Sequence, residues 1–471
     1  MNSLRRRTTQ LAAVLLFGVL WAPDLVASDG GIPAGEYKQR RDSVLARMEP
    51  HSVAVFRAND PDHRSNDVNY RYRQESNFLY LTGIDEQGAY LMLSKDGVTP
   101  PGLSLTHEVL FMEPNEKNAV TGETLGLEGA DRVGAFECLL ERKMFADVFA
   151  SALQGQKVLY LPTPNPDIIV NSWTGARTIH SRETKKVLEE RYPGLSVKNA
   201  ASLVAGLRVI KSSAELALLK QAIEATVDGH IEAMKSCEPG MNEYDLQAVV
   251  EYCFARGGAA YEGFPSIIGS GPNSCVLHYE QNRRPMASGE VVVLDIGAEV
   301  QGYSADVTRT LPVSGKFTAD QKALYDLVHK AQEAVFRAIK PGAKMSELTN
   351  VSNGVIGDGL VALGILKDPA EAKTYSRHGV SHFVGLDVHD AGGYDGVLRP
   401  GMVITVEPGI YVPAGSACDK KYWNIGIRIE DDVLVTASGG EVLSLGAPRS
   451  AADIERTMKA KGVGNVPLGE H

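Results

Sequence analysis

Cysteine and basic residues are both scarce in this chain of 471 residues. The five cysteines are odd in number and widely separated, and no two of them form a C-x-x-C motif. This pattern indicates neither a disulfide scaffold nor a zinc site built from thiolates. Lys and Arg together number 48 against 58 Asp and Glu, so the formal net charge is −10. An acidic chain argues against a protein that binds the phosphate backbone of nucleic acids, which requires a basic face.

Long hydrophobic segments are also missing, apart from one near the amino terminus. Three arginines, Arg5 to Arg7, precede 12 uncharged residues, Leu11 to Ala22, and small residues follow around Ala27. This order is typical of an export signal peptide, whereas a membrane span needs about 20 apolar residues. We therefore predict that residues 1–28 are a signal peptide and that the mature protein is periplasmic or secreted, without a permanent membrane span. An uncleaved anchor and a mitochondrial-type presequence are the alternatives.

Two common catalytic motifs are absent as well. The chain has no G-x-S-x-G sequence, the turn that presents the nucleophilic serine of many hydrolases. Its glycine-rich segment at residues 269–273 lacks the lysine of a phosphate-binding P-loop. Neither a serine hydrolase of this type nor a P-loop nucleotide-binding protein is therefore indicated.

The composition itself, 44% hydrophobic and 23% charged, is that of a globular protein long enough for two or three domains. From residue 37 to about 204, short β-like runs alternate with turn signals and helical stretches, which predicts an α/β domain. The segment Tyr70–Phe78 within it is interpreted as a surface turn, with a substrate mouth as the alternative. The β-like runs are Ser52–Phe56, Phe78–Leu81, Ala89–Leu93, Val109–Met112 and Val158–Leu161.

A second region follows a connection near residues 200–212. Ser212 and Glu215 have the S-x-x-E spacing of a helix capping box, and apolar residues then recur at three- and four-residue intervals up to Met234. Beyond this helix, helical stretches alternate with strands that carry acidic residues inside apolar runs. The helical stretches are Glu243–Arg256, Ala319–Ile339 and Met345–Leu363.

The positions of four acidic residues are the most informative feature. Asp295, Asp306, Glu407 and Glu430 each lie in or at the end of a β-like run of Val, Ile and other apolar residues. An unpaired carboxylate in an apolar interior costs several kcal/mol, so buried charges are paired or bind metal. Four such residues in one domain predict a shared cationic partner.

Basic residues available to neutralise these acids are too few. Arg428 shares a strand face with Glu430 and can pair with one acid, but not with four. Two divalent cations supply the four positive charges that are needed. Carboxylates together with a histidine suit Mn, Co, Fe or Zn and argue against a soft-metal or iron–sulfur site.

Histidines are concentrated in one segment of the same region. His378, His382 and His389 lie within twelve residues, and His278 is a fourth candidate. Two metal ions about 3.5–4 Å apart can share a hydroxide and polarise a carbonyl oxygen, which favours hydrolysis of an amide or ester. The remaining histidines would then donate hydrogen bonds to the developing oxyanion. The residues alone therefore predict a dinuclear metallohydrolase.

The motifs that carry these residues resemble, in this order, those of the pita-bread metallopeptidases, and within them the aminopeptidase P (Xaa-Pro aminopeptidase) family. The likeness also includes the segment Tyr72–Phe78, so it covers nearly the whole mature chain. The catalytic motifs are LDIG at 294–297, GYSADVTRT at 302–310, SHFVGLDVHD at 381–390, TVEPG at 405–409 and GIRIEDD at 426–432.

This resemblance implies a fold class and a division of the chain. We expect an α/β N-terminal domain of the creatinase type followed by an α+β pita-bread catalytic domain. The expected boundaries are residues 34–205 for the first domain, 206–447 for the second and 448–471 for a C-terminal tail. As in the family, the first domain is expected to shape the active-site mouth and to mediate self-association into a dimer or tetramer.

The resemblance also implies a ligand set and a reaction. Two divalent ions, usually Mn²⁺, would be held by Asp295, Asp306, His382, Glu407 and Glu430, with Asp306 and Glu430 bridging them. A bridging hydroxide would attack the carbonyl before proline and release the N-terminal residue of an Xaa-Pro peptide, with Glu407 as proton shuttle. Residues expected around the substrate, or supporting those that touch it, are His278, His378, His389, Tyr411 and Arg428.

Three other functions remain open at this point. A prolidase, which cleaves only Xaa-Pro dipeptides, shares the metal ligands, although the Tyr72–Phe78 and Leu386–Asp390 segments favour aminopeptidase P. If the chain were a methionine aminopeptidase, its large first domain would have no role. A non-catalytic pita-bread module that binds peptides is expected to have lost metal ligands, and none is missing here.

Overall fold

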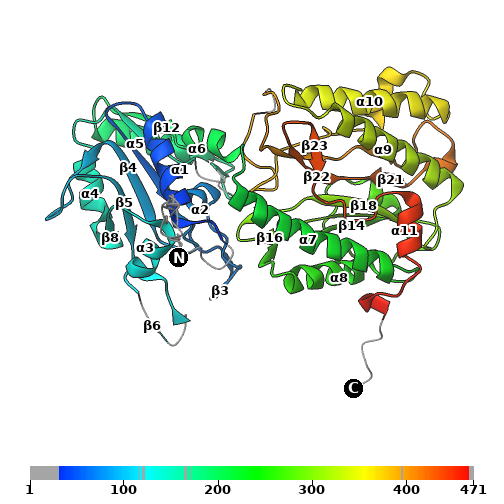
Figure 1. Ribbon diagram of the computed structural model, residues 1–471, viewed down its shortest axis with the longest axis horizontal. Coiled ribbons are helices and arrows are strands. Elements are labelled where there is room, and N and C mark those ends of the chain that lie inside the picture. Colours follow the sequence, from blue (N-terminus) through cyan, green and yellow to red (C-terminus); the bar gives the residue numbers. More distant parts are fainter. Residues whose placement is uncertain are drawn as a thin grey trace, which may run out of the picture.

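A computed structural model of the chain describes residues 31–115, 117–118, 122–163, 167–170, 172–393 and 396–465. Its two domains lie side by side along the long axis of the molecule and are joined through α6 (Ala201–Arg208) and α7 (Ser213–Ser236) (Figure 1). The predicted signal peptide, residues 1–28, lies outside the described residues and stays a prediction. Within the described part of the chain, none of the helices combines the length and apolar character that crossing a bilayer requires.

The first domain is built on a mixed six-stranded sheet in the order β12-β9-β1-β4-β5-β8. β1 pairs in parallel with β9 and antiparallel with β4, which in turn pairs antiparallel with β5. The strands are β1 (Ser52–Arg57), β4 (Tyr90–Val98), β5 (Thr106–Met112), β8 (Leu139–Glu141), β9 (Val158–Leu161) and β12 (Ser196–Asn199).

Helices cover both faces of this sheet, so its strands are apolar on both sides. In β1, Ala54 and Phe56 pack into one core cluster while Val53 and Val55 pack into another, as the two-residue period of a strand requires. The helices on the first face are α1 (Ala34–Arg47), α2 (Ser76–Thr82), α3 (Gly126–Gly134) and α6, and those on the second are α4 (Phe145–Ala152) and α5 (His180–Arg191).

One predicted strand of this domain is a helix instead. Residues Phe78–Leu81 belong to α2, where the Glu75 side chain accepts a hydrogen bond from the Phe78 amide at 2.6 Å and so caps the first turn. Gly83 ends the helix in a left-handed conformation, with φ of +70°. A short apolar run fits a buried strand and a buried helix equally well, so the capping residues decide between them.

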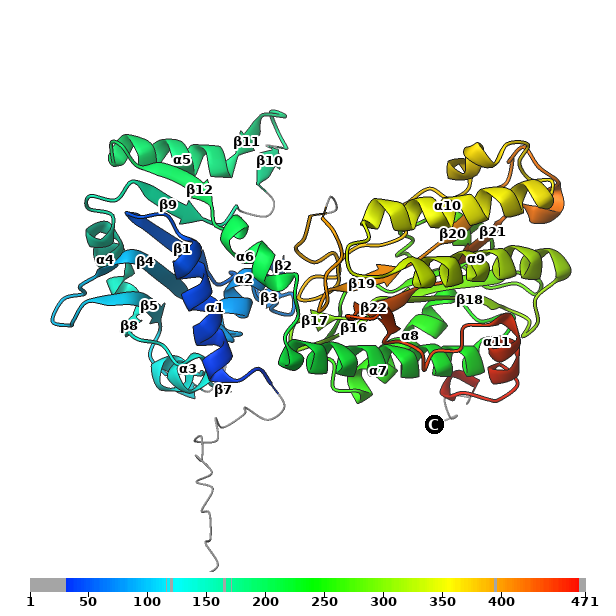
Figure 2. The same ribbon diagram turned by 45° about the horizontal axis from the view of Figure 1, so that its top comes forward.

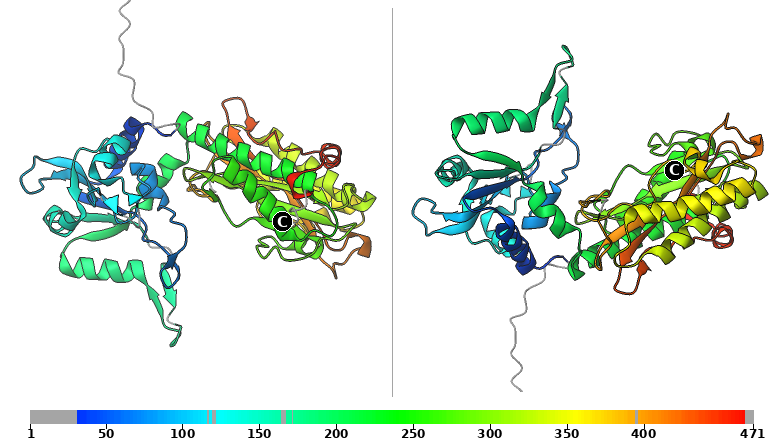
Figure 3. Two further views of the ribbon diagram at one scale, coloured as in Figure 1. Left: turned by 90° about the horizontal axis from the view of Figure 1, so that it is seen from below. Right: turned by 90° about the horizontal axis from the view of Figure 1, so that it is seen from above.

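The second domain places several short sheets between two pairs of helices. The pair α7 and α8 (Glu243–Arg256) covers one side, and the pair α9 (Ala319–Ala338) and α10 (Met345–Ala362) covers the other (Figures 1 and 2). Views from below and above show these pairs on opposite faces (Figure 3). The main strands are β14 (Ile267–Ser270), β15 (Val291–Ile296), β18 (Val307–Pro312), β19 (Val403–Val406), β20 (Gly409–Val412), β21 (Ile425–Arg428) and β22 (Asp431–Val435).

The helices predicted for this domain are confirmed, and their capping residues explain why. Ser212 and Glu215 form a reciprocal capping box at the start of α7, with hydrogen bonds of 3.1 and 3.0 Å. Asn242 and Asp245 do the same at the start of α8. In the segment predicted as a tail, α11 (Ala451–Thr457) packs into the core of this domain through Ala451 and Ile454, while residues 466–471 lie outside the described ranges.

All five cysteines lie within the described ranges, and each has a free thiol. Three of them, Cys138, Cys237 and Cys275, are buried, and burial raises the pKa of the Cys237 thiol to about 12. They act as small apolar side chains, in line with the absence of a disulfide or thiolate motif from the sequence.

Candidate metal centre

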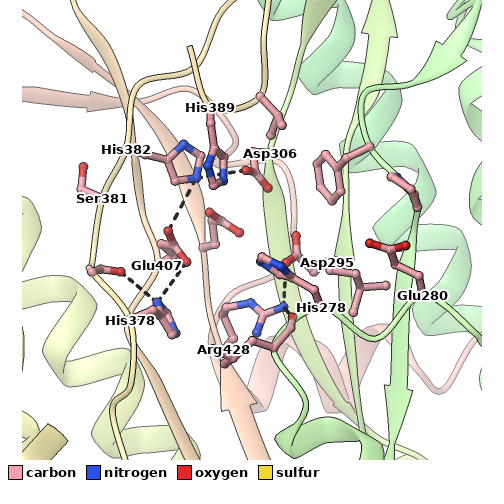
Figure 4. A pocket seen from close by; sticks show the side chains of 17 residues that line it. His278, Glu280, Asp295, Asp306, His378, Ser381, His382, His389, Glu407 and Arg428 are labelled. Carbon is pink, nitrogen blue, oxygen red and sulfur yellow. Dashed lines mark hydrogen bonds and ion pairs between the residues drawn. The ribbon is translucent and has the colours of Figure 1, made fainter. Parts of the chain in front are cut away.

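The four strand-embedded acids converge on one cavity of the second domain. Asp295 lies in β15, Asp306 precedes β18, Glu407 follows β19, and Glu430 lies between β21 and β22. The first, second and fourth are buried, and Glu407 is half-buried. The cavity has a volume of about 540 Å³ and is lined by all four carboxylates (Figure 4). Hydrogen bonds between remote strands, such as that of 3.0 Å from the Glu430 amide to the Thr308 carbonyl, bring together residues more than a hundred positions apart, which is why this cluster is not local in the sequence.

A histidine joins the carboxylates at the distance that a metal ion requires. One ligand atom each from Asp306, His382 and Glu430 lies within 4.8 Å of the others. His382 Nε2 is 3.3 Å from Asp306 Oδ2 and 3.6 Å from Glu407 Oε1. Its Nδ1 is 3.1 Å from the carbonyl oxygen of Phe383, which can only accept, so Nδ1 carries the proton and the Nε2 lone pair faces the acids.

Asp295 completes the cluster from the opposite side. Its Oδ2 accepts a hydrogen bond of 2.6 Å from Arg428, whereas its buried Oδ1 has no hydrogen-bond partner among the described residues. A buried carboxylate oxygen without a partner costs free energy that a bound cation would recover. The donor set of carboxylate oxygens and one imidazole therefore fits a pair of hard or borderline divalent ions.

The raised pKa values of the clustered carboxyl groups also indicate that the cluster binds divalent ions. Burial, followed by the charges of Asp295, Asp432 and Glu407, raises the pKa of Asp306 well above its usual value. Burial and the neighbouring Asp306 do the same to Glu430. Burial raises the pKa of Glu407 to about 7, although His382 and Arg428 oppose the shift. Divalent ions would reverse these shifts because they favour the ionised carboxylates.

The remaining histidines line the same cavity. The His389 ring packs against that of His382, with centroids 4.1 Å apart and the rings tilted by 38°, and His278 lies beside Asp295 in Figure 4. His378 Nδ1 lies 2.8 Å from the Gly379 carbonyl and 3.3 Å from Glu407 Oε2. Burial lowers the pKa of His378 to about 4, so it is neutral at pH 7.

Tyr411 lies behind the residues that line the cavity and does not line the cavity itself. Its side chain is fully buried, its hydroxyl accepts a hydrogen bond of 2.8 Å from Arg428, and it donates one of 2.7 Å to His378 Nε2. Of the two roles expected for Tyr411, around the substrate or in support of residues that touch it, its position fits the second: it fixes His378 and Arg428, both of which line the cavity.

The structure also shows a residue that the sequence analysis missed. The Gln332 side-chain amide, on α9, donates hydrogen bonds to the carbonyls of Val406 and Ile429 at 3.0 and 3.1 Å. These two residues directly precede Glu407 and Glu430, so one side chain fixes the spacing of two acids. A third bond, of 3.0 Å, goes to Asp431 Oδ2. The signal in the sequence is a polar residue on the buried face of an amphipathic helix, four positions after Val328.

We expect Gln332→Met to weaken metal binding at least tenfold and to lower the free energy of unfolding by about 2–3 kcal/mol, since methionine keeps the volume but loses the hydrogen bonds that the two amide N–H groups share among three acceptors. Equilibrium dialysis against Mn²⁺ measures the first effect, and urea unfolding of the metal-free protein measures the second. Lys330→Met, an exposed change on the same helix, is the control. Unchanged Mn²⁺ affinity in Gln332→Met would show that the two strand ends keep their spacing without this amide.

Comparison with known proteins supports the same conclusion. The models for "Metallopeptidase family M24" and "Aminopeptidase P, N-terminal domain" match residues 217–437 and 37–181. The Xaa-Pro aminopeptidase of Escherichia coli is 36% identical over 442 residues, which are 90% of this chain and 98% of that protein. The intermediate cleaving peptidase 55 of Arabidopsis thaliana mitochondria is 33% identical, over 91% of this chain and 83% of its own.

Solved structures agree with the fold described above. An aminopeptidase of Pseudomonas aeruginosa superimposes with a TM-score of 0.81 at 35% identity, over 91% of this chain and 98% of that one. These matches confirm the predicted fold class, a creatinase-type N-terminal domain followed by a pita-bread catalytic domain. The chain therefore belongs to metallopeptidase family M24, and it is an enzyme of that family with the N-terminal domain of aminopeptidase P.

Proposed function

We propose that this enzyme is an Xaa-Pro aminopeptidase, which releases the N-terminal residue from peptides that have proline in the second position. The observation that carries the proposal is the convergence of four carboxylates and His382 on one cavity that three further histidines also line. Relatives named Xaa-Pro aminopeptidase, similar over nine-tenths of this chain, support the same activity.

We propose that five residues hold two divalent ions, with Mn²⁺ as the metal that the family resemblance favours. Figure 4 shows His382 and Glu407 on one side of the cluster and Asp295 on the other, with Asp306 on the remaining edge. Bound there, the ions would polarise the substrate carbonyl and lower the pKa of a water molecule shared between them. The five residues are Asp295, Asp306, His382, Glu407 and Glu430.

Side chains around this cluster would handle the proton and the developing charge. Glu407 lies 3.6 Å from His382 Nε2 and 3.3 Å from His378 Nδ1 at the cavity, where its carboxylate would take up a proton and pass it on. His389 faces the cavity beside His382, and burial lowers its pKa, so it donates an N–H to the carbonyl oxygen as a neutral imidazole. Arg428 and Tyr411 keep His378 in one orientation through a chain of hydrogen bonds.

The apolar part of the cavity suits a proline ring. The cavity is lined by Phe264, Pro265, Leu277 and Val388 as well as by the charged residues. Proline in the second position supplies no N–H to a peptidase, so recognition of the ring by apolar surface replaces the missing donor.

We expect the protein, supplied with Mn²⁺, to release Arg from Arg-Pro-Pro and to act much more slowly on the dipeptide Gly-Pro. Arg-Ala-Ala, which has the same first residue but no proline, is the matched control substrate. Liberated amino acids are measured by chromatography. Hydrolysis of the dipeptide alone would identify a prolidase, and no hydrolysis of any of the three, with or without Mn²⁺, would favour a module that only binds peptides.

A further inference from the structure

The segment that carries His389 is held at both ends by residues outside its own loop. Asp387 and Asp390 flank Val388 and His389, the two residues of this segment that line the cavity. We call residues 386–390 the His389 segment. Its two aspartates point away from the cavity toward charged residues of the N-terminal domain and of the connection between the domains.

Arg208, at the end of α6, bonds to both aspartates. Its Nη2 donates a hydrogen bond of 2.6 Å to Asp387 Oδ2 and a second, shorter one to Asp390 Oδ1. Its Nη1 donates to the Asn77 side-chain oxygen at 3.0 Å. Arg208 and Asp390 are both buried, so solvent does not screen this pair, whereas the Asp387 side chain is 47% exposed.

A second positively charged side chain bonds to the C-terminal end of the His389 segment. Lys211 Nζ, also buried, lies 2.9 Å from Asp390 Oδ2. Although burial acts to raise it, the pKa of Asp390 is held below its usual value by Lys211 and Arg208. Asp390 is therefore charged and fully paired at neutral pH, and it lies directly beside His389.

The Tyr72–Phe78 segment of the N-terminal domain contributes the remaining contacts. Arg73 Nη2 donates to the Leu386 carbonyl at 2.6 Å, and the Ser76 hydroxyl donates to Asp387 Oδ1 at 2.6 Å. The interpretation of this stretch as a surface turn is therefore wrong for these residues. They contact a loop more than three hundred positions away, which no local pattern in the sequence could indicate.

The backbone of the His389 segment closes into a compact loop. The Asp390 amide donates to the Phe383 carbonyl at 2.8 Å, and the Gly385 amide donates to the Asp387 carbonyl at 3.1 Å. A Cβ at position 385 would collide with the Asp390 carboxylate, so only glycine fits there. With both ends and the turn fixed, the backbone that carries His389 is held in place, and its ring lies against that of His382.

We propose that Arg208, together with Ser76 and Lys211, is a positioning group for His389, and that the N-terminal domain takes part in catalysis through this contact. The inference rests on the proposed function, in which His389 donates to the substrate carbonyl. Its specific content is that these residues act on the reaction by way of His389 and not by supporting the fold in general.

The first part of the test compares single variants on Arg-Pro-Pro. Arg208→Met is expected to lower kcat about 10- to 100-fold, since a displacement of about 1 Å in a catalytic group has effects of this size. KM should change less than about threefold and Mn²⁺ content should stay at wild-type level, because the metal ligands are untouched. Ser76→Ala, which removes one hydrogen bond, should lower kcat about 3- to 10-fold.

Arg71→Met is the matched control. Arg71 lies in the same stretch and also crosses between the domains, with a bond of 2.9 Å to the Ala260 carbonyl, but it does not contact the His389 segment. Its kcat should stay within about twofold of wild type. Hydrogen exchange of residues 383–391 should speed up in Arg208→Met and Ser76→Ala and not in this control, because the bonds of the loop open more often.

The second part repeats the changes in a His389→Ala background. If the residues act through His389, neither Arg208→Met nor Ser76→Ala lowers kcat further by more than about twofold there. Losses that simply multiply, or single variants that fold and keep wild-type kcat, would overturn the inference. If Arg208→Met does not fold, Ser76→Ala decides between the outcomes. A wild-type protein without peptidase activity would contradict the proposed function instead, and a fully active His389→Ala would overturn the inference by showing that His389 is not needed.

Discussion

Replacing Asp306 with asparagine is expected to lower kcat/KM at least about a thousandfold while the fold stays intact, because this carboxylate is central to the proposed ion pair. Asp306 lies within ligand distance of both His382 and Glu430, so its loss removes a shared donor and not a peripheral one. Asparagine has the same size and keeps the packing around it. Hydrolysis of Arg-Pro-Pro and metal analysis of the purified variant measure the effect.

The same variant should be more stable than wild type when both are free of metal. The charges of Asp295, Asp432 and Glu407 oppose ionisation of Asp306, so a neutral amide should raise the free energy of unfolding by about 1–3 kcal/mol. Asp326→Asn, an exposed change on α9, serves as the control and should alter neither property. A variant Asp306→Asn that keeps more than about a tenth of the wild-type kcat would refute the assignment of two ions to this cluster.

Removal of metal by a chelator should abolish activity and leave a protein whose stability falls steeply with pH. In the metal-free state, burial and the neighbouring carboxylates raise the pKa of Asp306 and Glu430 well above the usual range. Burial raises the pKa of Asp432 to about 8. The folded cluster then holds more protons than the unfolded chain, so the free energy of unfolding decreases as pH rises.

The effect of the carboxyl groups on stability can best be measured from about pH 6.5 to about pH 8. Below this range, buried neutral histidines make the free energy of unfolding increase with pH, because burial lowers the pKa of His230 to about 3 and that of His378 to about 4. Above pH 6.5 these histidines are mostly neutral in both states, and their opposing effect fades by about pH 7.5. Each carboxyl that stays protonated only in the folded state then lowers stability by about 1.4 kcal/mol per pH unit.

Urea unfolding with and without Mn²⁺ across that range measures the difference. The loaded protein should show almost no slope, because ions keep the carboxylates charged in the folded state, and it should also unfold at a higher urea concentration. Asp306→Asn without metal should show a shallower slope than metal-free wild type. Equal slopes with and without Mn²⁺ would mean that the cluster does not bind the ions.

The metal ligands could be predicted from the sequence because a carboxylate inside an apolar strand is costly wherever it occurs. Asp295 and Glu430 violate the apolar pattern around them, and that violation is visible without a structure. Helix α8 was predicted with its observed bounds, Glu243–Arg256, since capping residues and apolar periodicity are both local signals.

The residues that support the metal ligands act through contacts between remote parts of the chain. Such contacts are much harder to predict from the sequence. Arg208 and Asp390 are 182 positions apart, and either one alone looks like a surface charge. In the sequence, Gln332 looks like any other helix residue. Only the structure shows that its side chain bonds to the ends of two strands. Tyr411 could be taken for a residue that touches the substrate, because only the packing shows that His378 and Arg428 stand in front of it.

The five unpaired thiols mean that folding of this chain does not require an oxidising environment. No covalent cross-link holds the described part of the structure together, so its stability does not depend on the redox potential of the surroundings. The chain needs neither an oxidant nor a disulfide isomerase, and reductants such as dithiothreitol should leave its melting temperature unchanged. A reducing cytosol and an oxidising extracellular fluid are therefore equivalent environments for its folding.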